Sequence, residues 1–140
     1  MILLQKTKLM HIKLTAVVTA LLLLSSPVVA QQKKAAWPEM KTFHSFMAST
    51  FHPAEEGDLA PLKANADSLY NAAIAWQASA IPATFKNNET KEALQQLVKQ
   101  CAEIKESVNN KKDDALLTKL ITEAHDTFHH IVGECRKADE

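Results

Sequence analysis

The chain has 140 residues with 16 basic and 16 acidic side chains, so its formal net charge is zero. It contains only two glycines and is rich in helix-forming residues, which argues against a β-sandwich and against a glycine-rich phosphate loop. The sequence has no basic patch with interleaved aromatic residues, so nucleic-acid binding is not expected.

Residues 1–30 have the pattern of a secretory signal peptide. Three lysines precede an apolar run at 14–24, and Val28 and Ala30 form a small-residue cleavage pattern before Gln31. The alternative is a transmembrane anchor, but the run is shorter than the roughly 20 residues that a membrane-spanning helix needs. We therefore expect a periplasmic or secreted protein that is free of the membrane after cleavage. The mature chain would keep 13 basic against 16 acidic residues, a net charge of −3.

The remaining sequence predicts a flexible tail at 31–36 and four amphipathic helices at about 37–52, 58–80, 89–110 and 114–137. Apolar residues recur in each at steps of three and four. These stripes consist of Trp37, Met40, His44, Met47 and Phe51; Leu62, Ala66, Leu69, Ala73 and Trp76; Leu94, Leu97 or Val98, Cys101, Ile104 and Val108; and Leu117, Ile121, Ala124, Phe128, Ile131 and Cys135. Short connections between such helices predict an all-α, up-down-up-down four-helix bundle.

The bundle forms one domain, residues 37–137, and local signals predict where its helices begin and end. Pro53 should end the first helix, because proline disfavours helical backbone at the residue before it. Asp58 is a good cap for the second helix, and Asp113 or Asp114 can cap the fourth.

Two histidines of the last helix, His125 and His129, are four residues apart, so they lie one turn above the other on one flank of its stripe. Two imidazoles at that spacing can bind one metal ion. Counted at 1.5 Å per residue from one end of the bundle, His44 lies roughly 12 Å deep, His125 roughly 16 Å and Cys101 roughly 15 Å. Metal-binding side chains from three helices are therefore expected at nearly one level.

A shared ion would explain why several histidines lie near the core, since burying an imidazole costs free energy unless its nitrogens find partners. Imidazole together with soft sulfur suits copper or zinc rather than calcium or magnesium. His130 should lie on the polar surface. The predicted ligands are His44, His125 and His129, with His52, Met47 and Cys101 as additional candidates.

Each candidate also has a structural interpretation, with Cys101 and Met47 as core packing and His44 as a satisfied polar residue. No acid–base pair and no nucleophile with an orienting base is evident, so an enzyme is not expected. Two alternatives to a copper or zinc protein stay open: a b-type haem electron-transfer protein, and a helical interaction module without a cofactor. A metal ion is the expected partner, and a homodimer is compatible with the sequence.

Segments 40–47, 57–69 and 128–136 resemble those of the cytochrome c′ and cytochrome b562 class of exported four-helix bundles. The resemblance extends over most of residues 37–137. It implies the same fold and an exported location.

Cytochrome c′ proteins carry Cys-x-x-Cys-His-x-x-Phe-Arg near the end of the last helix. Aligned at the arginine, this chain has Phe128 and Ile131 in place of the cysteines and Val132 in place of the histidine, so covalent haem attachment is not implied. A b-type haem, as in cytochrome b562, needs a methionine of the first helix and a histidine of the last. The resemblance gives Met40 and His129 as the nearest such pair.

The two cysteines should not form a disulfide with each other. In an antiparallel arrangement Cys101 and Cys135 are offset by 11 residues, or roughly 16 Å along the bundle axis. A disulfide needs Cα atoms within about 7 Å. We expect Cys101 to be buried, as core packing or as a ligand. Cys135 lies near the C-terminus, where fraying can expose it to an intermolecular bond.

Overall fold

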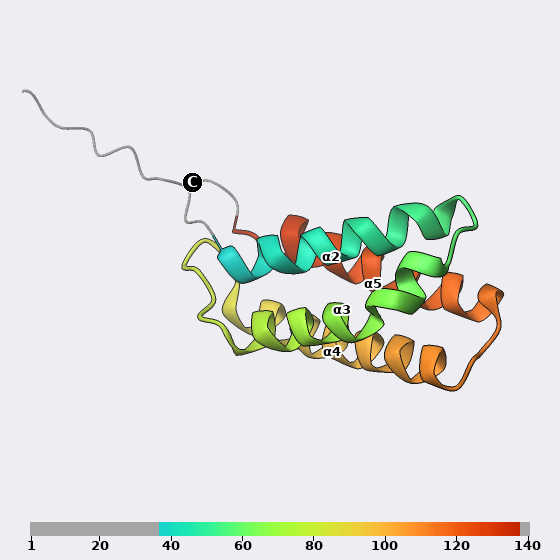
Figure 1. The fold of residues 1–140 in the computed structure, drawn as a ribbon. Helices are drawn as coiled ribbons and strands as arrows, with labels where there is room; N and C mark the ends of the chain where they lie inside the picture. The colour runs from blue at the N-terminus through green and yellow to red at the C-terminus, as the bar shows by residue number, and fades with distance from the viewer. Residues whose placement is uncertain (1–36, 138–140) are drawn as a thin grey trace, which may run out of the picture. The chain divides into compact units, whose positions relative to one another are not determined.

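The computed structural model describes residues 37–137, which form four α-helices (Figure 1). These are α2 (Pro38–Glu55), α3 (Ala60–Ala78), α4 (Asn87–Asn109) and α5 (Asp114–Gly133). The backbone of each helix lies close to that of the next helix along the chain, and α5 also lies close to α2, whereas the backbones of the diagonal pairs α2–α4 and α3–α5 do not approach each other closely. This ring of neighbours is the predicted up-down-up-down four-helix bundle.

The predicted signal segment 1–30 and the tail 31–36 lie outside the described residues. None of the four described helices is long and apolar enough to cross a membrane.

The predicted stripes of α3, α4 and α5 form the core. Burying one large apolar side chain contributes about 1.5–3 kcal/mol, so four such stripes stabilise helices that would be unstable alone. The largest side chains with almost no exposed surface are Trp76, Phe43, Met47, Leu62, Leu69, Leu94, Leu97, Ile104, Leu117, Ile121, Ile131 and Thr50.

The predicted stripe of α2 is only partly correct. Phe43 and Thr50 are fully buried beside Met47, whereas His44 is exposed and Met40 is only partly buried. Helix α2 is therefore rotated about its axis from the predicted phase, so that the phenyl ring of Phe43 enters the core. This rotation moves His44 out of the buried face of α2.

The prediction that Pro53 ends the first helix is wrong, because α2 continues to Glu55 with Pro53 inside it. Proline cannot donate to the carbonyl of Ser49, but so close to the helix end this costs a single hydrogen bond. The end itself is a Schellman motif. The amide of Asp58 donates to the Pro53 carbonyl at 2.9 Å, and Gly57 supplies the left-handed residue with φ of 87°.

Helix α5 ends at Gly133, four residues before the predicted end at Lys137. Beyond it the chain leaves the helix and pairs with the loop between α3 and α4. The Lys86 amide donates to the Cys135 carbonyl at 2.7 Å, and Phe85 and Arg136 form an isolated antiparallel bridge. Hydrogen bonds to another segment thus replace the last helical turn.

Phe85 also joins this C-terminal segment to the start of the described chain. Its ring lies with its centroid 5.1 Å from that of Trp37 and 5.2 Å from the Arg136 guanidinium. The Trp37 indole in turn donates to the hydroxyl of Ser79 at 2.7 Å. Both ends of the described chain therefore pack on one loop.

Both cysteines are buried and free, in agreement with the axial offset that separates them. Cys135 is 1% exposed, so the expectation that fraying would expose it is wrong. Burial raises the pKa of the Cys135 thiol, while a hydrogen bond with Thr90 acts in the opposite direction.

A second left-handed residue, Lys111, ends α4 with φ of 53°. The Lys111 amide donates to Val108 and the Lys112 amide to Ser107, both at 3.0 Å, which is again a Schellman motif. Because a Cβ atom is unfavourable in this conformation, Lys111→Gly should raise the free energy of unfolding by about 0.5–1 kcal/mol. Urea denaturation measures the change. Lys112→Gly is the matched control, and an equal gain in both variants would contradict the explanation.

Candidate functional site

Helix α5 brings His125 and His129 together on the side that faces α2. Their Nε2 atoms are 3.1 Å apart, and the two rings are nearly perpendicular with centroids 4.4 Å apart. The four-residue spacing produces this contact, because residues i and i+4 are neighbours on one helix face. The predicted histidine pair is thus present in the structure.

The spacing of the two nitrogens suits one metal ion. Zinc–imidazole bonds are about 2.0–2.1 Å long, so nitrogens 3.1 Å apart would subtend an angle of roughly 98° at a shared ion. That angle lies between the square-planar value of about 90°, which Cu²⁺ accepts, and the tetrahedral value of about 109°, which Zn²⁺ prefers. The distance between the two nitrogens is therefore compatible with chelation of either ion.

Two phenylalanines support the imidazoles across the α2–α5 contact. The ring of His125 stacks on Phe51 of α2, with centroids 3.6 Å apart and an interplanar angle of 12°. A second pair has its histidine on α2, where the ring of His44 stacks on Phe128 of α5 with centroids 5.1 Å apart. Phe128 also lies against His129, at 5.4 Å. We call residues 44, 51, 125, 128 and 129 the α2–α5 histidine seam.

The pKa of His125 lies below the ordinary value of a histidine. Its side chain is 21% exposed, and this burial lowers its pKa. The neighbouring His129 lowers it further, and His52 does so weakly, whereas Asp126 and Glu55 act in the opposite direction. The neutral imidazole that results is the form that binds metal ions.

The other predicted ligands lie in different surroundings. His52 is exposed and pairs with Glu55 at 3.1 Å, while Met47 is buried in the core. Cys101 is also fully buried, and burial raises the pKa of its thiol to about 12. Across residues 37–137 no group of three or more His, Cys, Asp or Glu side chains could hold one ion. One chain therefore supplies two close donors, with His44 and His52 nearby.

The haem alternative involves Met40 and His129. Met40 packs partly buried against the core and His129 is exposed. The interior beside His129 is filled by Phe43, Trp76 and Phe128, whose ring centroids are 5.3–5.9 Å apart. A haem plane would have to displace these rings, so the residues present do not fit a haem in the described conformation.

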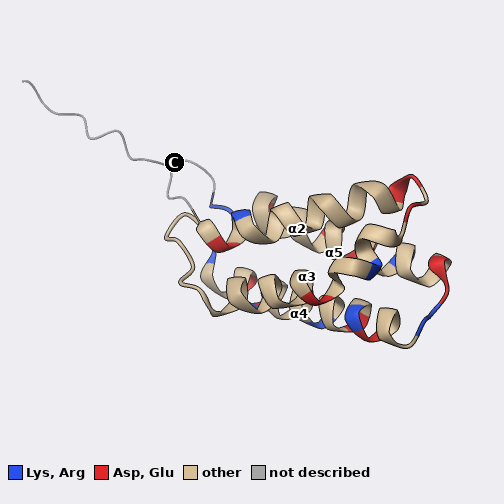
Figure 2. Cartoon of the chain, in the orientation of Figure 1, with Lys and Arg blue, Asp and Glu red and all other residues tan. Residues whose placement is uncertain are grey.

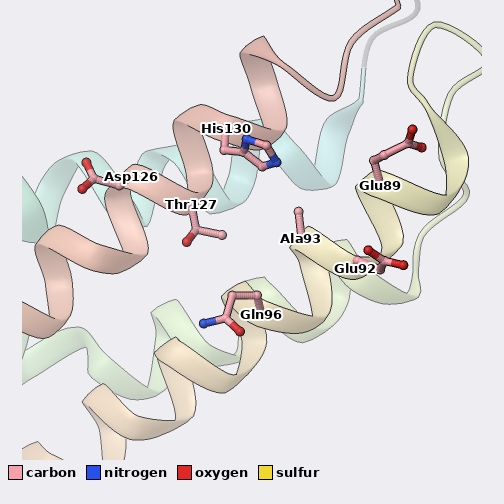
Figure 3. A pocket seen from close by; sticks show the side chains of 7 residues that line it. All are labelled: Glu89, Glu92, Ala93, Gln96, Asp126, Thr127 and His130. Atoms are coloured by element: carbon pink, nitrogen blue, oxygen red, sulfur yellow. The ribbon is translucent and has the colours of Figure 1, made fainter.

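His130 is exposed, as the sequence predicts, and belongs to a different surface from the histidine pair. It lies 3.0 Å from the Glu134 carboxylate at a shallow groove between α4 and α5, which Figure 3 shows. The side chains lining this groove are Glu89, Glu92, Ala93, Gln96, Asp126, Thr127 and His130. His130 is therefore a suitable control for the neighbouring His129.

Sequence reasoning missed the phenylalanines of the histidine seam as part of the site. Phe51 and Phe128 occupy stripe positions, so periodicity identified them as core residues and gave no signal that they also stack on imidazoles. A buttressed pair of imidazoles can chelate a metal ion or share one hydrogen bond. Comparison of the chain with protein-family models, with curated proteins and with solved structures gives no match.

Proposed function

We propose that this protein is an exported four-helix bundle that binds copper or zinc through His125 and His129. The observation that carries the proposal is the 3.1 Å separation of the two Nε2 atoms. His44, which stacks on Phe128, and His52, which pairs with Glu55, are not grouped with the two histidines into a three-ligand site within residues 37–137. Export rests on the signal-like pattern of residues 1–30.

The surroundings of the pair favour binding over catalysis. Phe51 and Phe128 hold the imidazoles from the inner side, and the exposed position of His129 leaves the outer side of an ion accessible. Imidazole donors suit Zn²⁺ and Cu²⁺, and Cu²⁺ binds more tightly at a given nitrogen site. An accessible ion held by two protein donors can be exchanged readily, which suits carriage or storage.

The competing explanation is a hydrogen bond between two neutral rings, in which one Nε2–H donates to the other Nε2. That contact needs no metal and would be worth about 1 kcal/mol. The two explanations differ in what happens when one ring is removed. If the pair chelates an ion, removing one ring weakens metal binding strongly. If the pair only shares a hydrogen bond, removing one ring lowers the free energy of unfolding slightly and has no systematic effect on metal binding.

The test is a titration of residues 31–140, without a histidine tag, with Zn²⁺ and Cu²⁺ by calorimetry or with a competing chromophoric chelator. His125→Ala and His129→Ala should each weaken binding at least tenfold, because each removes half of the chelate. The matched control, His130→Ala, removes an adjacent exposed imidazole and should change the affinity less than twofold. Equal losses in all three variants, or no stoichiometric binding by the natural sequence, would refute the proposal.

A further inference from the structure

The donor set of one chain is incomplete for a structural zinc site. Such sites bind the ion tetrahedrally through four protein ligands. His125 and His129 supply two nitrogens, and across residues 37–137 no third His, Cys, Asp or Glu is grouped with them. Two coordination positions thus remain for donors from outside the chain.

The open positions point away from the bundle. Phe51 and Phe128 cover the inner side of the two imidazoles, and both phenylalanines are buried. His129 is exposed and His125 is partly exposed, so their free side faces the exterior along the α2–α5 contact. Another protein molecule can approach the ion only from this side.

The middle of α2 carries no formal charge. From residue 42 to residue 54 the helix contains no Asp, Glu, Lys or Arg, and Figure 2 shows the corresponding uninterrupted tan stretch. Loss of charged residues is what distinguishes the centre of a protein interface from the rest of a surface. Asp126 of α5 and Glu55 at the end of α2 both act on His125, so two copies meeting here would bring these acidic groups near the shared ion, whose positive charge offsets their mutual repulsion.

Four exposed hydroxyl groups of α2 and α5 are already satisfied within their own helices. Thr42 and Ser49 donate to carbonyls of α2, each at 3.1 Å, and Thr118 and Thr122 donate to carbonyls of α5 at 2.9 and 2.8 Å. Covering a hydroxyl that keeps its hydrogen bond costs far less than covering one that loses it. These four hydroxyls can therefore be covered by a partner without new polar contacts.

We infer that a second copy of this chain completes the metal site, so that one zinc ion is held by His125 and His129 of both copies. A two-fold axis through the ion would relate the copies, which is the commonest symmetry of homodimers. Each copy would present the same uncharged face of α2 to the other. This inference rests on the proposed function and adds to it the partner and the stoichiometry.

Sedimentation velocity of untagged residues 31–140 tests it, with ZnCl₂ added from zero to one ion per chain. The protein should be monomeric in EDTA and dimeric at one zinc per two chains, and EDTA should restore the monomer. His129→Ala should stay monomeric with the same zinc, because each copy then offers a single nitrogen. His130→Ala should dimerise like the natural sequence.

The outcomes separate this inference from the proposed function. A monomer that binds one zinc per chain, with affinity lost in His129→Ala, would overturn the dimer and leave the metal site in place. A protein that binds no zinc at all would overturn both. A dimer that persists in EDTA, or that forms equally well in His129→Ala, would also overturn the metal-bridged arrangement.

Discussion

Phe128→Ala should lower the free energy of unfolding by about 3–5 kcal/mol, because it removes a large buried ring and leaves a cavity that the core cannot fully close. Phe128 is 5% exposed and lies within 5.9 Å of both Phe43 and Trp76, so three helices lose packing at once. Chemical denaturation followed by circular dichroism measures the loss. For a domain of this size such a change removes a large part of the total stability.

The control for this substitution is Ile74→Ala on α3, where the side chain is 39% exposed. An exposed apolar residue contributes little, so this variant should stay within about 0.5 kcal/mol of the natural sequence. A loss below about 1 kcal/mol for Phe128→Ala would contradict the central position of the ring. In the folded fraction of that variant, metal affinity should also fall, since His44 and His129 both lose the surface on which they pack.

Metal affinity should fall about tenfold to a hundredfold between about pH 7.5 and about pH 5.5, because protons compete for the imidazole nitrogens below the ordinary histidine pKa near 6.5. Burial and His129 lower the pKa of His125, so this ring resists protonation to a lower pH than an exposed histidine would. Titrations in buffered free metal at several pH values measure the effect. His129→Ala should show a shallower dependence, and a flat profile for the natural sequence would exclude imidazole ligands.

The lowered pKa of His125 also affects the stability of the metal-free protein. A histidine whose pKa is lower in the folded state binds fewer protons there than in the unfolded chain. The stability that neutral His125 contributes is therefore present above the ordinary histidine pKa and is lost as the pH falls through the lowered folded-state value. Acid should weaken both the fold and the metal site, and for the same reason.

The four helices and most of the core could be predicted because a repeat of three and four residues is a direct signature of a buried helix face. The phase of α2 could not, since Met40, His44 and Met47 form as regular a stripe as Phe43, Met47 and Thr50. Burial of the larger apolar ring of Phe43 decided the rotation. The end of α5 was missed because its replacement hydrogen bonds come from Lys86, far away in sequence.

The candidate site could also be predicted only in part. The contact of His125 with His129 follows from spacing within one helix, so the sequence was sufficient. Depth along the bundle axis placed Cys101 at the same level, but depth does not say on which side of a helix a residue lies. Cys101 is buried in the core from α4, which does not neighbour α2, whereas the histidine pair lies between α5 and α2.

The meeting of Trp37 and Arg136 on the ring of Phe85 has a consequence for how this chain can be re-engineered. Because both ends of the folded part are held at one loop, a short flexible linker from residue 137 to residue 37 would span them without crossing the bundle. The chain could then be reopened at the exposed turn around Gly57, which would give a circular permutant with the same helix order in space. In that permutant the α2–α5 contact would be formed by consecutive segments, and the histidine seam would become part of a local hairpin.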